Sequence, residues 1–513
     1  MSSRAVFTAV WLTAGVGPLA LAGQWSHFAA DPARSSLGVH GPRVLTQSAW
    51  TAPPQSDERL AFRSSPVTSG GRVFVNARRV VDNVHVANLA IAFDALTGQR
   101  LWRTEIERDQ LDSRSSPAVD ERNGAVLYAS GFTLHALAVD DGDVLWQTTL
   151  PRRVVNASPL VTSDLAVGGQ PANRAFISDY TGAGAGSQLH AINLDAYHAQ
   201  HNPHQPGDVV WSRSLGSSSG ATPAYANGRV YAGSYDAVFF PPDQFLYPGV
   251  LRAFDALSGE LIWSCSAEGD DGFFGGVTLT SEHVYAATYD FQRTGNNSRL
   301  FKVRTADGHV VWNAACERST ACPVAAADGC VYLAAGIDGF GSASRVQAFK
   351  DLGDSAQPLW DTYADTAGSL IVGGWTYQPA LARQRLYVGA PDSAPVLGPY
   401  EELRILDLSR TPSDPNFVIS AHEGSGGSPA IECGWLYSIG EAGVVAFHTA
   451  GECLADLDGD GLVGQGDLGL LLSCYGTIQG GSPCDELFDL NCDGLVNQSD
   501  LGILLAAWGK TCP

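Results

Sequence analysis

The apolar residues between positions 50 and 450 recur in a two-part pattern with a period of about fifty residues. The first part is a proline after small residues, followed by a run rich in β-branched and aromatic residues. The second part is a similar run that passes through an Asp-containing turn with glycine and closes on a tryptophan. Clear copies of it are residues 92–102, 136–146 and 253–263, and weaker copies end at Trp312 and Trp360. This periodicity predicts a series of small β-sheets.

Each repeat is predicted to be antiparallel, because its two strands are joined by a tight turn. In that turn an aspartate such as Asp94 accepts backbone hydrogen bonds, and Gly98 adopts a positive φ. One such sheet cannot bury both of its faces alone, so successive sheets must stack. A ring of stacked sheets, a β-propeller, leaves only short edges exposed. We therefore interpret the equivalent Asp140, Asp255 and Asp307 as turn residues and the closing tryptophans as packing between blades.

The number of repeats predicts the number of blades. The first part of the pattern begins at eight positions, with valine in place of proline at the fifth: 66, 117, 159, 223, 277, 323, 379 and 429. The last repeat lacks a closing tryptophan, because an acidic segment follows Phe447 almost at once. Trp50, which precedes the first repeat, is predicted to lie on an outer strand of the last blade and to close the ring. We predict an all-β, eight-bladed propeller, with seven blades as the alternative.

These repeats resemble the pyrroloquinoline-quinone-type repeat, whose Ala-x-Asp-x-x-Thr/Ser-Gly-x-x-x-Trp segment is its tryptophan-docking motif. The stretch from Trp25 to Arg34 is similar to the N-terminal segment of secreted members, so the resemblance spans about residues 25–450. It implies the fold, whereas the functions of the family range from quinone-dependent dehydrogenases to non-catalytic scaffolds of outer-membrane protein insertion. The best-known alcohol-oxidising members carry an adjacent-cysteine disulfide, and this chain has no Cys-Cys pair. Bound pyrroloquinoline quinone is therefore disfavoured.

Past residue 453 the pattern changes to an acidic loop followed by an apolar helix, and this unit occurs twice. The loops are Asp456-Leu-Asp-Gly-Asp-Gly-Leu-Val-Gly-Gln-Gly-Asp467 and Asp489-Leu-Asn-Cys-Asp-Gly-Leu-Val-Asn-Gln-Ser-Asp500. Oxygen-bearing side chains at positions 1, 3, 5 and 12, with glycine at position 6, suit the hard oxygen ligands that calcium prefers. Each following helix has apolar residues at i, i+3, i+4 and i+7, which are Leu468, Leu471, Leu472 and Tyr475, then Leu501, Leu504, Leu505 and Trp508. The two helices are predicted to bury these faces against each other.

This arrangement resembles the type I dockerin domain over about residues 453–513. The resemblance implies two calcium sites. The ligands of the first would be Asp456, Asp458, Asp460, Asp467 and the backbone carbonyl of Leu462. The ligands of the second would be Asp489, Asn491, Asp493, Asn497, Asp500 and the backbone carbonyl of Leu495. The first loop departs from the family pattern at position 9, where Gly464 replaces the usual asparagine.

Dockerins bind cohesin modules through loop positions 10 and 11 and the helix that follows. Here those positions hold Gln465-Gly466 and Gln498-Ser499, not the Ser-Thr pair of cellulosomal members. The resemblance therefore implies calcium-stabilised folding and a protein partner, which is either cohesin-like or a cell-surface protein.

Charge and N-terminal composition narrow the partners and the compartment. The formal net charge of −22 argues against nucleic acid and anionic lipid as partners, because both require basic surfaces. Arg4, an apolar run to Leu19 and then Ala20-Leu21-Ala22 predict a cleaved export signal, with a membrane anchor as the alternative. No later segment is apolar enough to span a bilayer, so we expect no membrane span after cleavage.

The ten cysteines fit an oxidising compartment, with five before residue 450 and five after it. None forms a C-x-x-C pair, so a zinc or thioredoxin-like site has no support. Because both halves hold an odd number, either one bridge joins them or thiols remain. The candidate bridges are Cys316–Cys322, Cys474–Cys484 and, between the halves, Cys433–Cys453.

Two further motifs are interpreted as connectors between strands. Residues 216–220 match the G-x-S-x-G nucleophile pattern, but that pattern acts between a strand and a helix, and here it joins two strands. His198, His201 and His204 stand three apart, and the neighbouring prolines argue against a helix that would align them on a metal.

The sequence thus predicts a signal peptide (1–22), a propeller (23–450) and a dockerin-like calcium-binding domain (453–513) in a bacterial protein that is secreted or on the cell surface. The predicted function is binding or scaffolding, with the C-terminal domain attaching the propeller to a protein partner when calcium is bound. The alternative is a secreted enzyme carried by the same domain, either a quinone-dependent dehydrogenase or an enzyme of polysaccharide catabolism.

Overall fold

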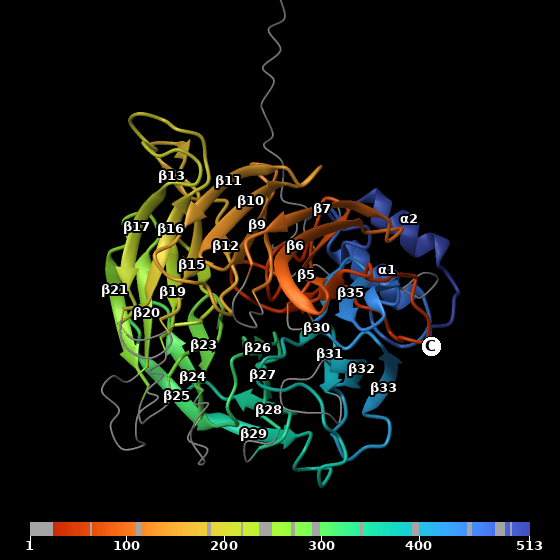
Figure 1. Cartoon of the computed structure of the whole chain (residues 1–513). Coiled ribbons are helices and arrows are strands. Elements are labelled where there is room, and N and C mark those ends of the chain that lie inside the picture. The colour runs from red at the N-terminus through yellow and green to blue at the C-terminus, as the bar shows by residue number, and fades with distance from the viewer. Residues whose placement is uncertain are drawn as a thin grey trace, which may run out of the picture.

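In the computed structural model the chain forms a ring of eight β-sheets with two helices at its rim (Figure 1). The eight-bladed prediction is confirmed, and the seven-bladed alternative is wrong. The structure describes residues 24–61, 64–108, 115–181, 186–216, 219–234, 249–267, 272–289, 298–338, 342–391, 400–448, 454–477, 488–492 and 495–512. The predicted signal peptide lies outside these residues.

The first four blades follow the chain from β3 to β21, and each contains a four-stranded antiparallel meander. Blade 1 comprises β4 (Val67–Ser69), β5 (Arg72–Val81), β6 (Val84–Asp94) and β7 (Arg100–Ile106), with β3 (Glu58–Leu60) paired to β5. Blade 2 comprises β8 (Ala118–Asp120), β9 (Ala125–Ser130), β10 (Thr133–Ala138) and β11 (Val144–Thr149). Blade 3 comprises β12 (Leu160–Val161), β15 (Arg174–Ser178), β16 (Gln188–Asn193) and β17 (Val209–Ser214), with an inserted hairpin of β13 (Ala166–Val167) and β14 (Gln170–Pro171). Blade 4 comprises β18 (Ala224–Ala226), β19 (Arg229–Ala232), β20 (Val250–Asp255) and β21 (Leu261–Ser266).

The other four blades continue to β36, and two of them take a strand from the N-terminal part of the chain. Blade 5 comprises β22 (Val277–Leu279), β23 (His283–Ala287), β24 (Arg299–Arg304) and β25 (Val310–Ala315). Blade 6 comprises β26 (Val324–Ala325), β27 (Cys330–Ala335), β28 (Arg345–Asp351) and β29 (Ala356–Asp361). Blade 7 comprises β30 (Ala380–Ala382), β31 (Arg385–Pro391), β32 (Tyr400–Asp407) and β33 (Val418–Glu423), with β1 (Leu37–Gly38) parallel to β30. Blade 8 comprises β34 (Ala430–Glu432), β35 (Trp435–Gly440), β36 (Gly443–His448) and β2 (Trp50–Ala52).

The ring closes through β2, which pairs antiparallel with β36 although the two lie almost 400 residues apart. Trp50 on this strand donates its indole N–H to the backbone oxygen of Ala95 in blade 1, at 2.9 Å. The prediction that Trp50 lies on the outer strand of the last blade is confirmed.

The closing tryptophans pack between blades, as predicted. Trp102 donates its indole N–H to the backbone oxygen of Val139 in blade 2, at 3.0 Å. A Cβ on Gly142, whose φ is +75°, would lie 2.6 Å from the same ring, so only glycine fits beneath it. Trp263 and Gly308 repeat this contact between blades 4 and 5. The Asp-turn-Gly segment and the tryptophan are therefore two halves of one contact between neighbouring blades.

The residues that precede the inner-strand prolines, and Val277 in blade 5, occupy equivalent positions around the axis, and we call them the pre-proline ring. Its members are Ser65, Ser116, Ser158, Thr222, Gly276, Cys322, Gln378 and Ser428. For five of the eight members, the backbone N–H donates to the side chain of the member in the next blade. The bonds run from Ser65 to Ser116 (2.8 Å), Ser116 to Ser158 (2.9 Å), Ser158 to Thr222 (3.1 Å), Cys322 to Gln378 (2.8 Å) and Gln378 to Ser428 (3.0 Å). These bonds explain why a side chain that can accept a hydrogen bond stands before most of the prolines.

The N-terminal residues 24–45, which we call the axial segment, run past the inner strands of successive blades. Backbone hydrogen bonds join it to blades 1, 2, 4 and 5 through the amides of Thr68, Val119, Tyr225 and Leu279. In blade 3 the N–H of Val161 donates to the ring of His27, at 3.0 Å. The axial segment therefore lies inside the ring of inner strands.

Arg34 anchors the axial segment at the axis. Its side chain is fully buried and donates to three backbone oxygens, those of Phe28 (2.9 Å), Pro159 (3.0 Å) and Pro223 (2.9 Å). Burial lowers the pKa of the guanidinium to about 10, so it stays charged at neutral pH. A buried cation that is satisfied by carbonyl oxygens fixes both the segment and the blades that supply them.

Helices α1 (Gln465–Ser473) and α2 (Gln498–Ala506) follow the propeller and lie at its rim beside β35 (Figure 1). In the described part of the chain, no helix has both the length and the apolarity needed to cross a membrane.

Candidate calcium centre

The first acidic loop brings three of its predicted ligands together. Ligand oxygens of Asp456, Asp458 and Asp460 all lie within 4.8 Å of one another, with Asp456 buried and the other two exposed. Each of these aspartates also accepts a backbone N–H two or three residues further on, which bends the loop around the cluster. Among the described residues this is the one group of three or more acidic, histidine or cysteine side chains whose ligand atoms converge.

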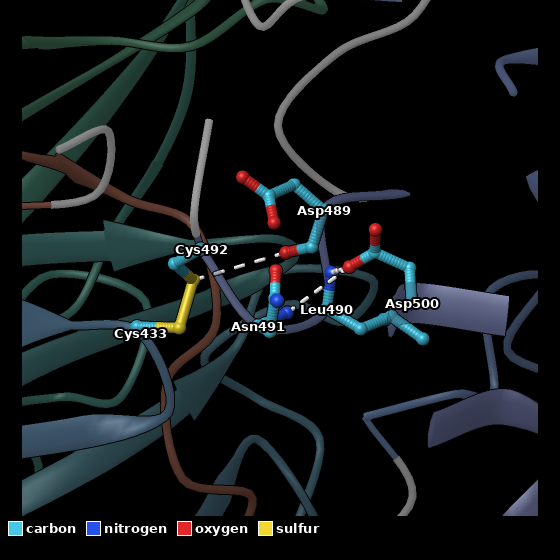
Figure 2. Close-up of a disulfide and its surroundings, with 6 residues drawn as sticks. All are labelled: Cys433, Asp489, Leu490, Asn491, Cys492 and Asp500. Atoms are coloured by element: carbon cyan, nitrogen blue, oxygen red, sulfur yellow. Dashed lines mark hydrogen bonds between the residues drawn. A yellow bond between two sulfur atoms is a disulfide. The ribbon is translucent and has the colours of Figure 1, made fainter. Parts of the chain in front are cut away.

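The aspartate at position 12 organises both loops in the same way. Asp467 accepts the N–H groups of Leu457 (2.5 Å), Asp458 (3.2 Å) and Gly464 (2.6 Å). In the second loop, Asp500 accepts the N–H groups at the matching positions, at 2.7, 3.2 and 2.8 Å. Figure 2 shows Asp500 reaching back from α2 to the loop backbone. Both carboxylates also lie in the first helical turn, where the helix dipole favours negative charge.

The burial of the loop aspartates indicates whether these residues suit a cation. The aspartates at positions 1 and 12 of both loops, which are Asp456, Asp467, Asp489 and Asp500, are at most 1% exposed. Buried carboxylates are costly unless they are paired, hydrogen-bonded or bound to a metal. Backbone donors and one arginine satisfy part of this set, and an oxygen-only cluster with excess negative charge fits a hard divalent cation such as calcium. The donor set therefore fits the predicted ion.

Of the other predicted side-chain ligands, Asn491 is exposed and Asn497 is half-buried. The side chains of Leu462 and Leu495, whose backbone carbonyls were predicted to bind calcium, are exposed. Asn491 is exposed beside Cys492, and Asn497 uses its side-chain oxygen to accept the N–H of Ser499, at 2.7 Å. Asp493 lies outside the described residues.

The two loops differ at positions 9 and 11. Asn497 caps α2 with its side chain, whereas Gly464 at the start of α1 has no side chain to do so. At position 11, a Cβ on Gly466 would lie 2.1 Å from a carboxylate oxygen of Asp458. Glycine there leaves room for the carboxylate, and the second loop has Ser499 at this position.

Each loop is hydrogen-bonded to the residues that follow the helix of the other unit. The residues after α2 bond to the first loop, through Val463 N–H to the Lys510 oxygen and Cys512 N–H to the Gly461 oxygen. The residues after α1 bond to the second loop through Val496. Each unit therefore completes the other.

The predicted burial of both helical faces is only half correct. Leu471 and Leu504 are buried in the shared core, and Leu468 and Leu501 pack against it. The other half of each face is exposed, comprising Leu472 (51%), Tyr475 (46%), Leu505 (52%) and Trp508 (47%). Val463 and Val496 of the two loops are buried in the same core as Leu471 and Leu504.

A disulfide joins this C-terminal module to the propeller. Cys433, in the turn between β34 and β35, is bonded to Cys492 at position 4 of the second loop (Figure 2). A bridge between the two halves was one of the two predicted outcomes, but its predicted partner, Cys453, is wrong. Position 4 has a positive φ in both loops, +76° at Gly459 and +56° at Cys492.

The other candidate bridges have different outcomes. Cys316 and Cys322 are buried thiols and do not form the predicted closure. Cys474 and Cys512 are disulfide-bonded, whereas Cys484, the predicted partner of Cys474, lies outside the described residues.

Polar contacts reinforce the junction of module and propeller. Arg43 of the axial segment pairs with Asp456 at 3.0 Å, and both side chains are largely buried. Arg383 of blade 7 donates to the backbone oxygen of Asp456 at 2.9 Å. His40 is buried against the backbone of Asp489, and burial together with Arg383 lowers the pKa of its imidazole to about 3. The first residue of each loop therefore contacts the axial segment.

The two other sequence motifs do not form sites among the described residues. His198 and His201 stack with ring centroids 4.9 Å apart, and His201 packs on the glycine turn of the β13–β14 hairpin. Ser219 of the 216–220 motif donates to the backbone oxygen of Gly233, as expected of a connector, while residues 217 and 218 lie outside the described part.

Sequence reasoning missed a serine–histidine–aspartate relay in blade 3. The ring of His190 contacts the hydroxyl of Ser212 at 2.8 Å and the carboxylate of Asp179 at 3.0 Å. The same strand position is polar in two other blades. There His135 accepts the backbone N–H of Glu107, and Gln347 accepts the backbone N–H of Glu317. At this position His190 instead contacts two side chains, and we assign the three residues no catalytic role.

The fold and the repeats define an eight-bladed propeller of the pyrroloquinoline-quinone type. The family model described as outer membrane protein assembly factor BamB matches residues 48–196 and 248–408, which is more than half of the chain. The chain belongs to this family.

Known relatives match parts of the chain. The BamB protein of Escherichia coli K12 is 30% identical over 112 residues, covering 20% of this chain and 25% of its own length. The BamB protein of Moranella endobia is 23% identical over 261 residues, covering 49% of this chain and 55% of its own. The chain thus spans about a quarter to about half the length of these relatives.

Solved structures share the fold. BamB of Moraxella catarrhalis has a TM-score of 0.51 at 16% identity and covers 77% of this chain and 96% of its own. Quinohemoprotein alcohol dehydrogenase of Comamonas testosteroni has a TM-score of 0.56 at 12% identity and covers 82% of this chain and 77% of its own. At these identities the likeness concerns the fold alone, and it includes both a named assembly factor and a named enzyme.

Proposed function

We propose that this chain is an exported protein-binding scaffold, a propeller attached to a partner by its dockerin-type calcium module. The observation that carries the scaffold part is the axial segment. The axial segment runs along the axis of the ring beside seven blades, and the side chain of Arg34 donates its N–H groups to backbone carbonyls. A propeller whose axis is filled by its own chain offers its outer faces and rim for binding.

The attachment part rests on the exposed half of the helical faces. Leu472 in α1 and Tyr475 in the turn after it correspond to Leu505 in α2 and Trp508 in the turn after that helix, 33 residues further on. Four large apolar side chains on so small a module are typical of a protein contact, in which aromatic residues supply much of the binding energy. The partner would be a cohesin-like module or a cell-surface protein.

Calcium would stabilise this module by binding Asp456, Asp458, Asp460 and Asp467 in the first loop and the matching residues of the second. Export to the bacterial surface or beyond is supported by the Cys433–Cys492 bond, which requires an oxidising compartment. It also agrees with relatives that are named outer membrane assembly factors.

Calorimetric titration of the full chain with calcium tests the metal. We expect about two sites and a rise in the melting temperature of the module, because metal binding contributes folding free energy. No heat of binding at millimolar calcium would refute the calcium proposal.

Capture of partners from the native cell envelope tests the attachment. We expect the wild-type chain to retain a specific protein with calcium and to lose it with chelator. The double variant Tyr475→Ser/Trp508→Ser should fail to retain it, while a control in the propeller, Leu352→Ser, exposed in the same way, should retain it. Equal retention by all three proteins would refute the proposed surface.

Addition of pyrroloquinoline quinone with calcium tests the enzyme alternative. A stoichiometric bound chromophore together with alcohol oxidation would overturn the scaffold proposal. Absence of both, in a protein that binds calcium, is the expected result.

A further inference from the structure

The axial segment leaves the propeller between blades 7 and 8, and there it is held on one side by the propeller. The N–H of Gly434 donates to the His40 oxygen, and the hydroxyl of Tyr387 donates to the Pro42 oxygen at 2.7 Å. The N–H of Leu45 donates to the hydroxyl of Ser420 at 2.8 Å. Residues 40–45 are therefore fixed against strands of both blades.

The C-terminal module covers the other side of the same residues. Arg43 binds the Asp456 carboxylate of the first loop, and His40 is buried against the backbone of Asp489, the first residue of the second loop. These are the same position of the two repeated loops. The loop side of the module thus meets residues 40–43 with both of its repeats.

The disulfide ties down this contact. Cys433 adjoins Gly434, whose N–H bonds to the His40 oxygen, and its partner Cys492 stands three residues after Asp489. Propeller, axial segment and module are therefore joined within a few residues of one another, by one covalent bond, one ion pair and backbone hydrogen bonds. Figure 2 shows the disulfide next to the start of the second loop.

The axial segment has a conformation that requires such support. Four of its non-glycine residues have a positive φ: Ala29 (57°), Ala30 (80°), Arg34 (61°) and Ser36 (56°). Such a conformation is unfavourable for an L-residue and persists only where surrounding contacts fix it. The segment is therefore held by contacts made elsewhere, along the axis and at its exit.

We propose that the loop side of the calcium module is an intramolecular docking surface whose partner is residues 40–43 of this chain, so that the module holds the axial segment in the ring. This inference rests on the proposed function only for the role of calcium in ordering the loops. It leaves the exposed residues Leu472, Tyr475, Leu505 and Trp508 for an external partner. The two faces of the module then have different partners, one within the chain and one outside it.

One carboxylate connects the two roles. Asp456 offers one oxygen to Arg43, while the other accepts the N–H of Gly459 within the convergent cluster of the first loop. An outer contact of this kind fixes the orientation of a metal ligand. A calcium ion bound by this loop would therefore be held through the same side chain that Arg43 contacts.

Hydrogen exchange of the full calcium-loaded chain tests the docking surface. Arg43→Gln should raise the exchange rate in residues 36–45 roughly tenfold or more, because a buried charged hydrogen bond is lost. The blades far from the module, 3 to 5, should exchange as in the wild type. Arg72→Gln, which breaks an exposed ion pair with Asp140, is the matched control and should change neither region.

A second variant separates the role of calcium. In Cys433→Ser/Cys492→Ser, chelator should raise exchange both in the module and in residues 36–45. If the module responds to chelator but residues 36–45 do not, and Arg43→Gln also leaves them unchanged, the docking surface is refuted while the calcium module stands. If the module does not respond to chelator in any variant, the calcium proposal fails, and Arg43→Gln alone decides the docking surface.

Discussion

Two glycines in α1 differ in what faces them. A Cβ on Gly469 would meet nothing within 4 Å, whereas a Cβ on Gly466 would lie 2.1 Å from a carboxylate oxygen of Asp458. Alanine favours a helix over glycine by about 1 kcal/mol at either position. The gain in helix propensity from a glycine-to-alanine change is thus the same at both positions. They differ only in that Gly466 faces the calcium loop and Gly469 does not.

We expect Gly466→Ala to weaken calcium binding by the first loop roughly tenfold, because the Asp458 carboxylate must leave its place in the ligand cluster. Gly469→Ala should instead stabilise the module by about 1 kcal/mol and leave calcium affinity unchanged. Calorimetric titration and thermal unfolding of the full chain measure both effects. Equal calcium affinity in the two variants would show that Asp458 is not a ligand.

Glu432, at the end of the inner strand of blade 8, gives the propeller a dependence on pH. Burial foremost, with repulsion from Glu121, raises the pKa of its carboxyl to about 7, against a hydrogen bond from Thr68 that lowers it. The hydroxyl of Thr68 accepts the N–H of Trp25 at the start of the axial segment, at 3.1 Å. An acid with a raised pKa binds its proton more tightly in the folded state, so its contribution to stability falls as pH rises from about 4.5 to 7.

The wild type should therefore lose stability between pH 5 and pH 8. We expect Glu432→Gln to lose less over the same range, with a difference on the order of 1–3 kcal/mol. Urea unfolding at both pH values measures it. Glu441→Gln, at an exposed carboxylate, is the control and should leave the pH dependence unchanged. A wild type that is equally stable at both pH values would contradict the assigned ionisation.

At the scale of elements, the inner strands are linked by the pre-proline ring. Ser116 accepts the N–H of Ser65 at 2.8 Å and is 1% exposed. The hydroxyl of Ser65 itself is buried without a hydrogen-bond partner. Ser116→Ala should therefore leave a buried N–H unpaired and cost about 1–3 kcal/mol, whereas Ser65→Ala should be nearly neutral.

Chemical unfolding of the two variants measures this difference directly, since they remove the same atom from neighbouring blades. A similar loss in both would mean that small size, not the hydrogen bond, selects serine at these positions.

Some elements of the fold could be predicted from the sequence and others could not. The repeated prolines and closing tryptophans predicted eight blades, because each repeat makes equivalent contacts with its neighbour. Trp50 could be placed because the last blade visibly lacked a strand. Cys492 could not be assigned to Cys433, and the exposure of Leu472 could not be seen, because both depend on contacts between distant segments that leave no periodic trace. The path of the axial segment was likewise hidden, since its hydrogen bonds use backbone atoms.

At the scale of the whole molecule, the interface that closes the ring differs from the interface between two consecutive blades. Between blades 1 and 2 the contact of Trp102 with Val139 joins blades that are consecutive in the chain. Between blades 8 and 1 the contact of Trp50 with Ala95 is made by a strand of three residues, β2, added to the last blade. The chemistry of the two contacts is the same, but only the second holds the ends of the ring together.

We expect Trp50→Phe and Trp102→Phe to lower global stability by similar amounts, about 1 kcal/mol for one lost hydrogen bond, because complete unfolding breaks both interfaces. Their local effects should differ. Trp50→Phe should raise hydrogen exchange in β2 and β36 under native conditions, since a short terminal strand opens without unfolding its blade. Trp102→Phe should leave local exchange in β7 and β10 unchanged, because opening there requires separation of two complete blades. Faster exchange in both variants would mean that every interface opens independently, and that β2 closes the ring no differently from any other outer strand.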